Sequence, residues 1–211
     1  MIDFYTWKTP NGRKISIMLE EVGLEYKVQP VNINQGDQHQ EEFLEICPNG
    51  KIPAILDHEN GISLFESGAI LLYLADKTKK LLPSGNAAYW EVIQWLMWQM
   101  GGVGPMFGQT HHFLKYHPDV SEYASARYHK ETLRLYGVLD QQLSKQTYLA
   151  GDYSIADIAV WPWVARFGWH QMKLSDYPNI LRWYLEIASR PAVQKGYDVP
   201  SFGETVPIPP E

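Results

Sequence analysis

The spacing of hydrophobic residues changes abruptly near the start of the chain. Residues 1–5 begin apolar and then alternate, which predicts a β-strand. Between residues 11 and 22 the apolar positions are Ile15, Met18, Leu19 and Val22, a spacing typical of an amphipathic helix. Gly23 follows as a helix stop. A strand therefore leads into a helix through the polar turn at residues 9–12.

The first third of the chain continues to alternate between strand and helix patterns. We expect a strand at residues 26–31, a short helix at 41–46, a hairpin formed by 53–57 and 62–64, and a helix at 67–77. The order β-α-β-α-β-β-α predicts an α+β layer with helices on a small mixed sheet. A first domain over residues 1–80 follows from this pattern.

After Lys80 the patterns are those of helices alone. Residues 82–86 have the composition of a linker. Helices are expected at 89–100, with a kink at the glycines that follow, and at 120–143 and 178–188. Residues 154–157 predict a capping box before an apolar helix. We expect a helical second domain over 87–200 and a proline-rich tail, 201–211, which is mobile or lies along the surface.

Charge and cysteine content exclude several classes of function. The formal net charge is -6, so nothing supplies the basic face of a nucleic-acid-binding protein. No apolar run reaches the roughly 18 residues of a membrane span. The single cysteine, Cys47, cannot form an intramolecular disulfide, which favours a reducing compartment, and we expect a cytoplasmic protein. Histidines and carboxylates show no ligand spacing, so no metal site is expected.

The turn between the first strand and helix carries candidate chemistry but no cysteine. Pro10 and Asn11 are good helix-start residues, with Asn11 as the cap, and this structural role needs no ligand. The functional alternative is that the Thr9 hydroxyl, the Asn11 amide and the helix N–H groups face a bound thiolate. Such surroundings lower the pKa of a thiol from its free value of about 8.5.

Two further stretches allow a peptide-like ligand. If the Ile52–Pro53 bond is cis, the backbone N–H and C=O of Ile52 would face outward and pair with an extended peptide, although an ordinary trans proline is the more common case. Ser67 is a good N-cap, and a helix N-terminus attracts a carboxylate, while Glu66 beside it would attract an ammonium group. A plain cap beside a solvated glutamate is the simpler alternative.

Taken together, several stretches resemble the glutathione transferases. The segments "KIPAI", "FESGAILLYLA" and "YSIADIA" stand where that family has them. Longer segments, "TPNGRKISIMLEE", "FLEICPNGKIPAILDH", "WQMGGVGPMFGQTHHF" and "RYHKETLRLYGVL", closely resemble the bacterial Nu class. The resemblance covers nearly the whole chain and implies a thioredoxin-like N-terminal domain followed by an all-α helical bundle. The hairpin is short for this class, and Cys47 stands where serine is expected.

The resemblance also implies roles for individual residues in the first domain. Thr9 and Asn11 would contact the glutathione sulfur. Gln38 would hold the glycine end of glutathione. Ile52 would pair through its backbone with the cysteinyl segment, immediately before a cis Pro53.

Three more residues complete the implied site. Glu66 and Ser67 would bind the γ-glutamyl end of glutathione. Arg127 would reach a glutathione carboxylate from the second subunit of a homodimer, although an arginine on a long helix is usually just solvated. Each site would take two glutathione thiols or one glutathione disulfide.

The implied activity is glutathione-dependent disulfide reduction, in which one thiolate attacks a substrate disulfide and a second glutathione resolves the mixed disulfide. Conjugation of electrophiles or reduction of hydroperoxides at the same site is an alternative within enzymes. A non-catalytic binding protein with this fold is an alternative of another class, because fold does not fix function.

Overall fold

The computed structural model describes residues 1–210, which form two compact units. The first comprises Met1–Leu82 and Ser189–Val206, and the second comprises Pro83–Ala188 and the chain from Pro207 onward. Ser189–Val206 therefore packs with the first unit, although the sequence pattern groups most of it with the helical domain. As domain limits, 1–80, 87–200 and 201–211 remain predictions. No helix within residues 1–210 is both long and apolar enough to cross a membrane.

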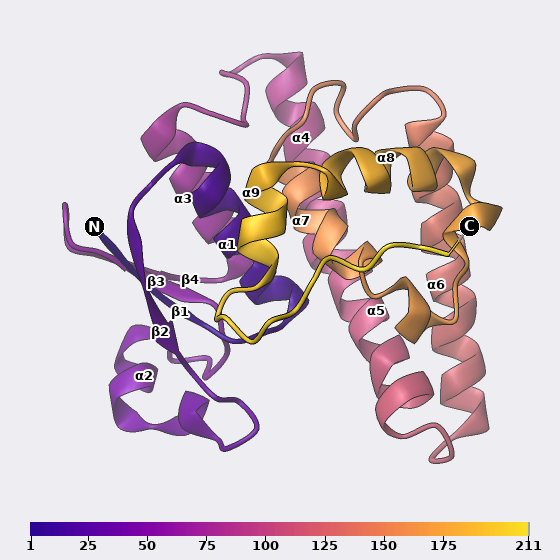
Figure 1. Cartoon of the computed structure of the whole chain (residues 1–211), viewed down its shortest axis with the longest axis horizontal. Coiled ribbons are helices and arrows are strands. Elements are labelled where there is room, and N and C mark those ends of the chain that lie inside the picture. The colour runs from indigo at the N-terminus through magenta and orange to yellow at the C-terminus, as the bar shows by residue number, and fades with distance from the viewer. Residues whose placement is uncertain (211) are drawn as a thin grey trace. The chain divides into compact units, whose positions relative to one another are not determined.

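A four-stranded mixed sheet forms the centre of the first unit (Figure 1). Its strands are β1 (Ile2–Thr6), β2 (Tyr26–Pro30), β3 (Ala54–Asp57) and β4 (Ile62–Phe65), in the order β2-β1-β3-β4. β1 runs parallel to β2 and antiparallel to β3, and β3 runs antiparallel to β4. The mixed sheet confirms the α+β expectation for this part of the chain.

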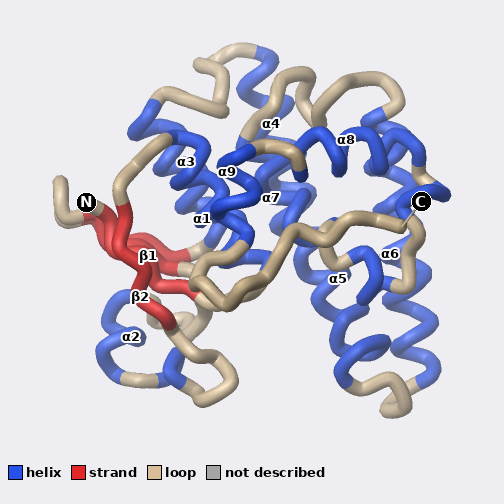
Figure 2. The backbone as a smooth tube through the Cα atoms, in the orientation of Figure 1, coloured by secondary structure: helices blue, strands red, loops and turns tan. Residues whose placement is uncertain are grey.

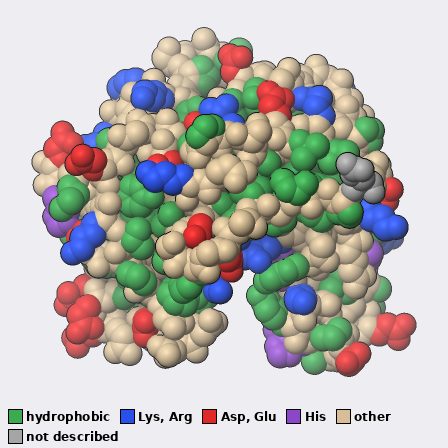
Figure 3. Space-filling view, viewed as in Figure 1, with side chains coloured by type: hydrophobic (Ala, Val, Ile, Leu, Met, Phe, Trp, Pro, Cys, Tyr) green, Lys and Arg blue, Asp and Glu red, His purple; other side chains and the backbone are tan. Residues whose placement is uncertain are grey.

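Helices cover both faces of this sheet (Figure 2). They are α1 (Pro10–Val22), α2 (Glu41–Ile46), α3 (Ser67–Thr78) and α9 (Pro191–Tyr197), with a 3₁₀ turn, η1 (Asp37–His39), before α2. α1 and α3 lie on one side and α2 on the other. Acidic side chains gather over α2 in Figure 3, where the sequence supplies Glu41, Glu42 and Glu45.

Local sequence explains the limits of α1. Thr9 is the N-cap, Pro10 opens the helix, and Gly23 ends it in the left-handed conformation with φ of 75°. Ile15, Met18 and Leu19 are fully buried, which confirms the apolar face predicted from their spacing. Burying such side chains stabilises the fold by about 1.5–3 kcal/mol each.

α9 was not expected from the sequence, and it packs closely on α1. A Cβ added to Gly196 would lie 2.8 Å from the backbone of Ile17, so only glycine fits at this helix crossing. The Ser16 hydroxyl donates a hydrogen bond to the Gly196 carbonyl over 2.6 Å. These contacts hold the last part of the chain against the first helix.

The second unit is helical. Its elements are α4 (Ala87–Trp98), the π-helical turn η2 (Gln99–Val103), α5 (Gly104–His111), the π-helical turn η3 (His112–Tyr116), α6 (Glu122–Leu143), α7 (Ile155–Val164), the 3₁₀ turns η4 (Phe167–His170) and η5 (Leu174–Asp176), and α8 (Pro178–Ala188). The kink expected after residue 100 takes the form of η2. The capping box at Ser154 and Asp157 is present as predicted.

Candidate functional site

Strand register brings three loops to one end of the sheet. Tyr5 pairs with Ala54, and Ala54 pairs with Phe65. The residues that follow β1, precede β3 and follow β4 are therefore neighbours at this end. They are the turn before α1, the Ile52–Pro53 segment, and the start of α3. The register brings together site residues that the sequence places in three separate stretches.

The mouth of α1 is shaped by Thr9 and Gly12. The Thr9 hydroxyl accepts a hydrogen bond from the Gly12 N–H over 3.2 Å, which makes Thr9 the N-cap. The expectation that Asn11 caps the helix is wrong, because Asn11 lies inside the first turn, where it is half-buried. A Cβ on Gly12 would come within 2.4 Å of the Thr6 hydroxyl oxygen and 2.5 Å of the Trp7 carbonyl oxygen, so the turn closes tightly only with glycine.

The Ile52–Pro53 peptide bond is cis. This confirms the geometry implied by the family resemblance rather than the commoner trans form. Within residues 1–210, no backbone hydrogen bond joins Ile52 to a helix, strand or turn. Its peptide groups are therefore suited to pair with an extended ligand.

The start of α3 differs from the sequence prediction in the residue that caps the helix. Glu66, not Ser67, occupies the N-cap position, and it has φ of 69° and ψ of 112°. A non-glycine residue in this region costs on the order of 1–3 kcal/mol and is often found at functional sites. Ser67 is the first helical residue and is 3% exposed, so the prediction of Ser67 as the N-cap is wrong. The Ser67 hydroxyl instead accepts a hydrogen bond from Lys14 Nζ over 3.1 Å.

Lys14 is a site neighbour that the sequence pattern did not reveal. It is 1% exposed, and burial lowers the pKa of its ammonium group to about 7, while the charge of Glu66 acts in the opposite direction. A signal for it exists, because Lys14 stands four residues before Met18 on the buried side of the helix. Lysine at such a position is uncommon unless it is paired or functional.

Gln38 lies in η1, near the Ile52 loop. A Cβ on Gly50 would lie 3.3 Å from the Gln38 carbonyl oxygen. The η1 turn therefore lies beside the loop that leads to Ile52. Gln38 Nε2 lies 3.1 Å from His39 Nε2. Gln38 Oε1 is buried and has no hydrogen-bond partner within the described chain. Because buried polar atoms are normally paired, this orphaned atom suits contact with a ligand.

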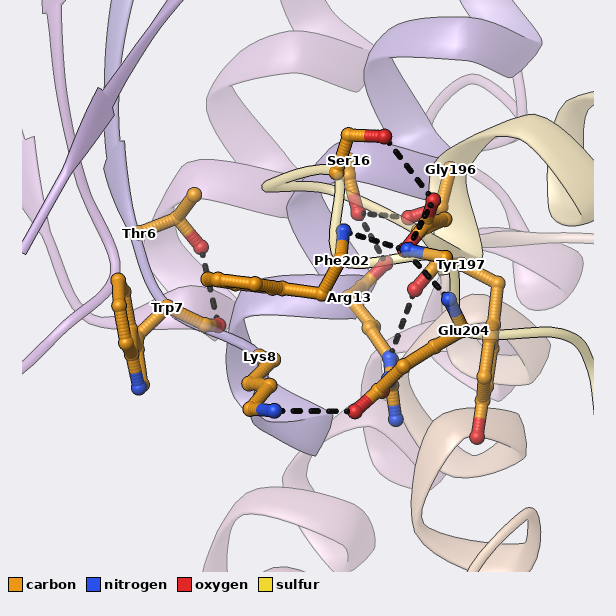
Figure 4. A network of polar contacts seen from close by, with 12 residues as sticks. Thr6, Trp7, Lys8, Arg13, Ser16, Gly196, Tyr197, Phe202 and Glu204 are labelled. Atoms are coloured by element: carbon orange, nitrogen blue, oxygen red, sulfur yellow. Dashed lines mark hydrogen bonds and ion pairs between the residues drawn. The ribbon is translucent and has the colours of Figure 1, made fainter. Parts of the chain in front are cut away.

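The chain after α9 contacts the turn between β1 and α1 (Figure 4). Arg13 is fully buried, its Nε donates to the Tyr197 carbonyl over 2.9 Å, and its guanidinium lies 3.6 Å from the centre of the Tyr197 ring. Arg13 also forms an ion pair with Glu204, and Lys8 Nζ lies 3.3 Å from Oε1 of the same carboxylate. Nothing in the local sequence pattern predicts these contacts.

A turn at Asp198 shapes this segment. The Asp198 carboxylate accepts hydrogen bonds from the backbone N–H groups of Phe202, Gly203 and Glu204 over 2.8–3.1 Å. These bonds place Phe202 against Trp7, with ring centres 5.0 Å apart. Residues 201–204, the first part of the tail expected to be mobile or to lie along the surface, are therefore attached to the turn that carries Thr9 and Asn11.

Cys47 is buried beside the segment that leads to Ile52. Its side chain is 1% exposed, and its thiol donates a hydrogen bond to the Lys51 carbonyl over 3.3 Å. A nucleophilic thiol needs an accessible position. The expectation of a structural role for Cys47 agrees with its burial.

Arg127 lies in the second unit, on α6. It is exposed and lines a groove of about 910 Å³ together with Tyr123, Lys130 and Arg134. The structure gives it no place in the first unit, so its part in the site stays a prediction. Within residues 1–210, histidine, cysteine and carboxylate side chains do not gather into a metal-binding group.

Models of two protein domains match the chain. Residues 2–76 match the glutathione S-transferase N-terminal domain, and residues 103–191 match the glutathione S-transferase C-terminal domain. The disulfide-bond oxidoreductase YfcG of Escherichia coli is 49% identical over 198 residues, which cover 91% of this chain and 92% of that protein. The disulfide-bond oxidoreductase YghU of the same organism is 41% identical, covering 92% of this chain and 73% of that protein.

Solved structures show the same architecture. A glutathione transferase from Burkholderia graminis, with two glutathione molecules bound per subunit, matches with a TM-score of 0.90 and 45% identity, covering 96% of this chain and 89% of that one. A glutathione transferase from Pseudomonas putida, with one glutathione disulfide bound per subunit, matches with a TM-score of 0.90 and 43% identity. The match covers 95% of this chain and 92% of that one. The chain described here belongs to the glutathione S-transferase family.

Proposed function

We propose that the protein is a glutathione-dependent disulfide-bond reductase whose reactive thiol comes from bound glutathione. The observation that carries this proposal is the position of the single cysteine, Cys47, which is buried and bonded to the Lys51 carbonyl. The protein has no other thiol with which to attack a disulfide. The mouth of α1, with the positive potential of a helix N-terminus, suits a thiolate instead.

The residues at the end of the sheet fit glutathione. Within residues 1–210, the Ile52 backbone makes no hydrogen bond to other backbone groups and suits the cysteinyl peptide unit. Gln38 Oε1, an acceptor with no partner there, suits the N–H of the glycine end. Glu66 and Ser67 suit the ammonium and carboxylate groups of the γ-glutamyl end, because Glu66 is exposed beside the N-terminus of α3.

When bound, glutathione supplies the electrons: two thiols become one glutathione disulfide while the substrate disulfide becomes two thiols. The protein contributes position and electrostatics. Thr9 and Asn11 would donate hydrogen bonds to sulfur and so favour the thiolate over the thiol. The N-terminal turn of α1 adds its dipole to the same effect.

The oxidoreductase names of YfcG and YghU and the glutathione disulfide in the Pseudomonas putida protein favour disulfide reduction. Conjugation of electrophiles or hydroperoxide reduction at the same site is the alternative enzyme function. A binding protein without useful turnover is the alternative outside enzymes. The single buried cysteine also favours a cytoplasmic location, and the sequence stretches quoted above favour the Nu class.

The test is reduction of a small model disulfide by glutathione, coupled to NADPH oxidation through glutathione reductase. Asn11→Ala should lower turnover about 10- to 100-fold, as expected for a lost hydrogen bond to a charged group. Thr9→Ala should also lower turnover but removes a helix cap, so Thr9→Ser, which keeps the hydroxyl, is the matched variant.

The controls are Cys47→Ser and Asn34→Ala, an exposed asparagine far from the turn in sequence, and both should keep wild-type turnover. A large loss in Cys47→Ser would overturn the proposal. Conjugation of an aromatic halide, measured in parallel, separates the alternatives. Good conjugation with weak disulfide turnover indicates an ordinary transferase, and glutathione binding without either reaction indicates a binding protein.

We further propose a homodimer in which Arg127 reaches the glutathione site of the partner subunit. Exposed Arg127 and Lys130 supply positive charge to the α6 groove that suits a carboxylate, while Arg134 in the same lining is paired with Glu131. Exposed Tyr123 and Leu133 on the same helix supply apolar surface suited to a subunit contact.

Sedimentation and calorimetric titration test this arrangement together. The wild type should sediment as a dimer, and Arg127→Ala should bind glutathione about tenfold more weakly without changing the sedimentation coefficient. Lys145→Ala, which removes a lysine just beyond α6, is the control. A monomer, or an unchanged affinity in Arg127→Ala, would remove Arg127 from the site.

A further inference from the structure

We infer that a buried histidine pair, His111 and His170, is an acid-sensitive switch in the second unit, which holds the turn η4 to α5 while both imidazoles are neutral and releases it when both are protonated. His111 is the last residue of α5, and His170 is the last residue of η4. The inference concerns the second unit by itself and goes beyond the proposed reaction with glutathione.

The histidine pair is joined by a hydrogen bond in a buried setting. His111 Nε2 lies 2.7 Å from His170 Nε2, and the two ring planes are nearly parallel, at 9°. His111 is 6% exposed and His170 is fully buried. Tyr136, on α6, places its hydroxyl oxygen 3.0 Å from the other ring nitrogen of His170, Nδ1. The pair therefore links η4 to both α5 and α6.

The number of protons on the histidine pair decides whether this bond forms. Two ring nitrogens form a hydrogen bond only when one of them carries a proton and the other does not. One added proton keeps a donor opposite an acceptor but puts a charge in a buried site. A second added proton would place two N–H groups against each other and break the bond. Opening of η4, which exposes both imidazoles to water, is therefore coupled to the uptake of two protons.

The surroundings of the histidine pair disfavour a positive charge. Burial, and then the charge of Arg166, lower the pKa of His111 to about 4. Burial, the neighbouring imidazoles of His111 and His129, and the same arginine hold the pKa of His170 well below its usual range. Tyr136 stays neutral, because burial raises the pKa of its hydroxyl well above the usual range. Both imidazoles are therefore neutral in the closed turn at neutral pH.

Carboxylates on the helices packed against the pair are exposed or bonded to other groups. α5 packs against α6 and α7, whose carboxylates are Glu122, Glu131, Asp140 and Asp157. Glu122 is exposed in the first turn of α6, and Glu131 pairs with Arg134. Asp140 and Asp157 accept hydrogen bonds from backbone N–H groups of α8 and of the loop before α7. The charges that act on the pair are therefore positive.

Five of the seven histidines of the chain lie in this part of the second unit. Besides the pair they are His112 and His117, with ring centres 4.7 Å apart, and His129, whose Nε2 is buried without a hydrogen-bond partner within the described chain. The exposed cations on η3 and α6 are Lys115, Arg127, Lys130 and Arg134. Acid thus adds positive charge to a region that already carries cations, which favours the open form.

The segment that would move carries backbone strain. Gln171, directly after η4, is in the left-handed conformation with φ of 59°. A non-glycine residue in this conformation persists only while surrounding contacts hold it. Loss of the bond between His111 and His170 removes one such contact, so residues 165–177, between α7 and α8, should open first.

The wild type provides the first test, from about pH 7 to about pH 4. Imidazole ¹⁵N shifts report the protonation of each histidine, and amide hydrogen exchange, corrected for its intrinsic rate, reports the opening constant. Below about pH 6 the opening constant of residues 165–177 should rise up to about 100-fold per pH unit, as the uptake of two protons requires. Protonation of either imidazole of the pair at about pH 6.5 with amide protection retained, or unchanged protection at about pH 4, would overturn the inference. Equal loss of protection in the first unit at the same pH would show global acid unfolding and would also overturn it.

A matched pair of variants tests the steepness of this response. His111→Gln keeps a neutral amide that donates to or accepts from His170 but removes one titrating group. Its opening constant should rise about tenfold per pH unit, because one proton is then taken up. His117→Asn removes an exposed imidazole from the same region and should keep the wild-type response. An unchanged response in His111→Gln, or its loss in His117→Asn, would show that the histidine pair is not the switch.

Discussion

Arg13 and Lys14 are consecutive buried cations on α1, yet they face two different regions of the first unit. The Arg13 region is closed by the chain itself, through the Tyr197 carbonyl, the Tyr197 ring and the Glu204 carboxylate. The Lys14 region contains the Ser67 hydroxyl and, at a distance, the charge of Glu66. Burial of a charge therefore does not by itself indicate function, because two neighbouring buried cations face regions of different chemistry.

The two cations also differ in their expected effect on the stability of the fold. Arg13 is bonded to the Tyr197 carbonyl and paired with Glu204, so its removal would leave both of these groups without it. Lys14 is buried beside the Ser67 hydroxyl, and because burial disfavours its charged form, carrying that charge lowers the stability of the folded protein.

The largest expected effect is loss of stability in Arg13→Met. The Tyr197 carbonyl would lose its donor in a buried setting, and Glu204 would lose its principal cation, which together should lower the free energy of unfolding by about 3 kcal/mol. Urea unfolding followed by circular dichroism measures the change. A loss below about 1 kcal/mol would mean that the segment after α9 contributes little to holding the turn.

Lys14→Met should have the opposite sign at low pH. Burial disfavours the charged form of Lys14, so replacing it by an apolar side chain of similar size should raise the free energy of unfolding at about pH 6 by about 1–3 kcal/mol. Lys14→Met would then be more stable than the wild type. A loss as large as that in Arg13→Met would remove the difference between the two regions.

The pH dependence of this gain follows from the lowered pKa. Below about pH 7 Lys14 is charged in both states and the folded state bears the full cost of burying it. Above that pH the folded state releases the proton while the unfolded state keeps it up to the ordinary value of 10.5, so wild-type stability rises with pH in this window. The gain in Lys14→Met should therefore shrink as the pH is raised from 7 toward 10, measured by urea unfolding of both proteins.

The sequence predicts those parts of this unit that local patterns determine. The apolar spacing of α1, its stop at Gly23 and the limits of α2 are confirmed. The cis Ile52–Pro53 bond followed from the family resemblance alone, because tertiary contacts and not the dipeptide select the isomer.

The parts that the sequence does not predict depend on distant partners. Arg13 is bonded to a carbonyl 184 residues away, and no periodicity along α1 carries that information. Serine is a preferred N-cap, yet Glu66 takes that position while Ser67 turns to Lys14. The local rule fails at the start of α3, where a tertiary contact overrides propensity.

The smallest expected effect concerns Asp198, which shapes the loop that presents Glu204 to Arg13. Asp198→Ala removes the acceptor for the N–H groups of Phe202, Gly203 and Glu204, but the loop is solvent-accessible and water replaces part of the loss. A decrease of about 1 kcal/mol in the free energy of unfolding is expected. Asp198→Ala should cost less in an Arg13→Met background, because Glu204 then has no buried cation to meet. Equal costs in both backgrounds would show that the loop stabilises the first unit independently of Arg13. The difference between the surroundings of Arg13 and Lys14 would then depend on the Tyr197 carbonyl and ring alone.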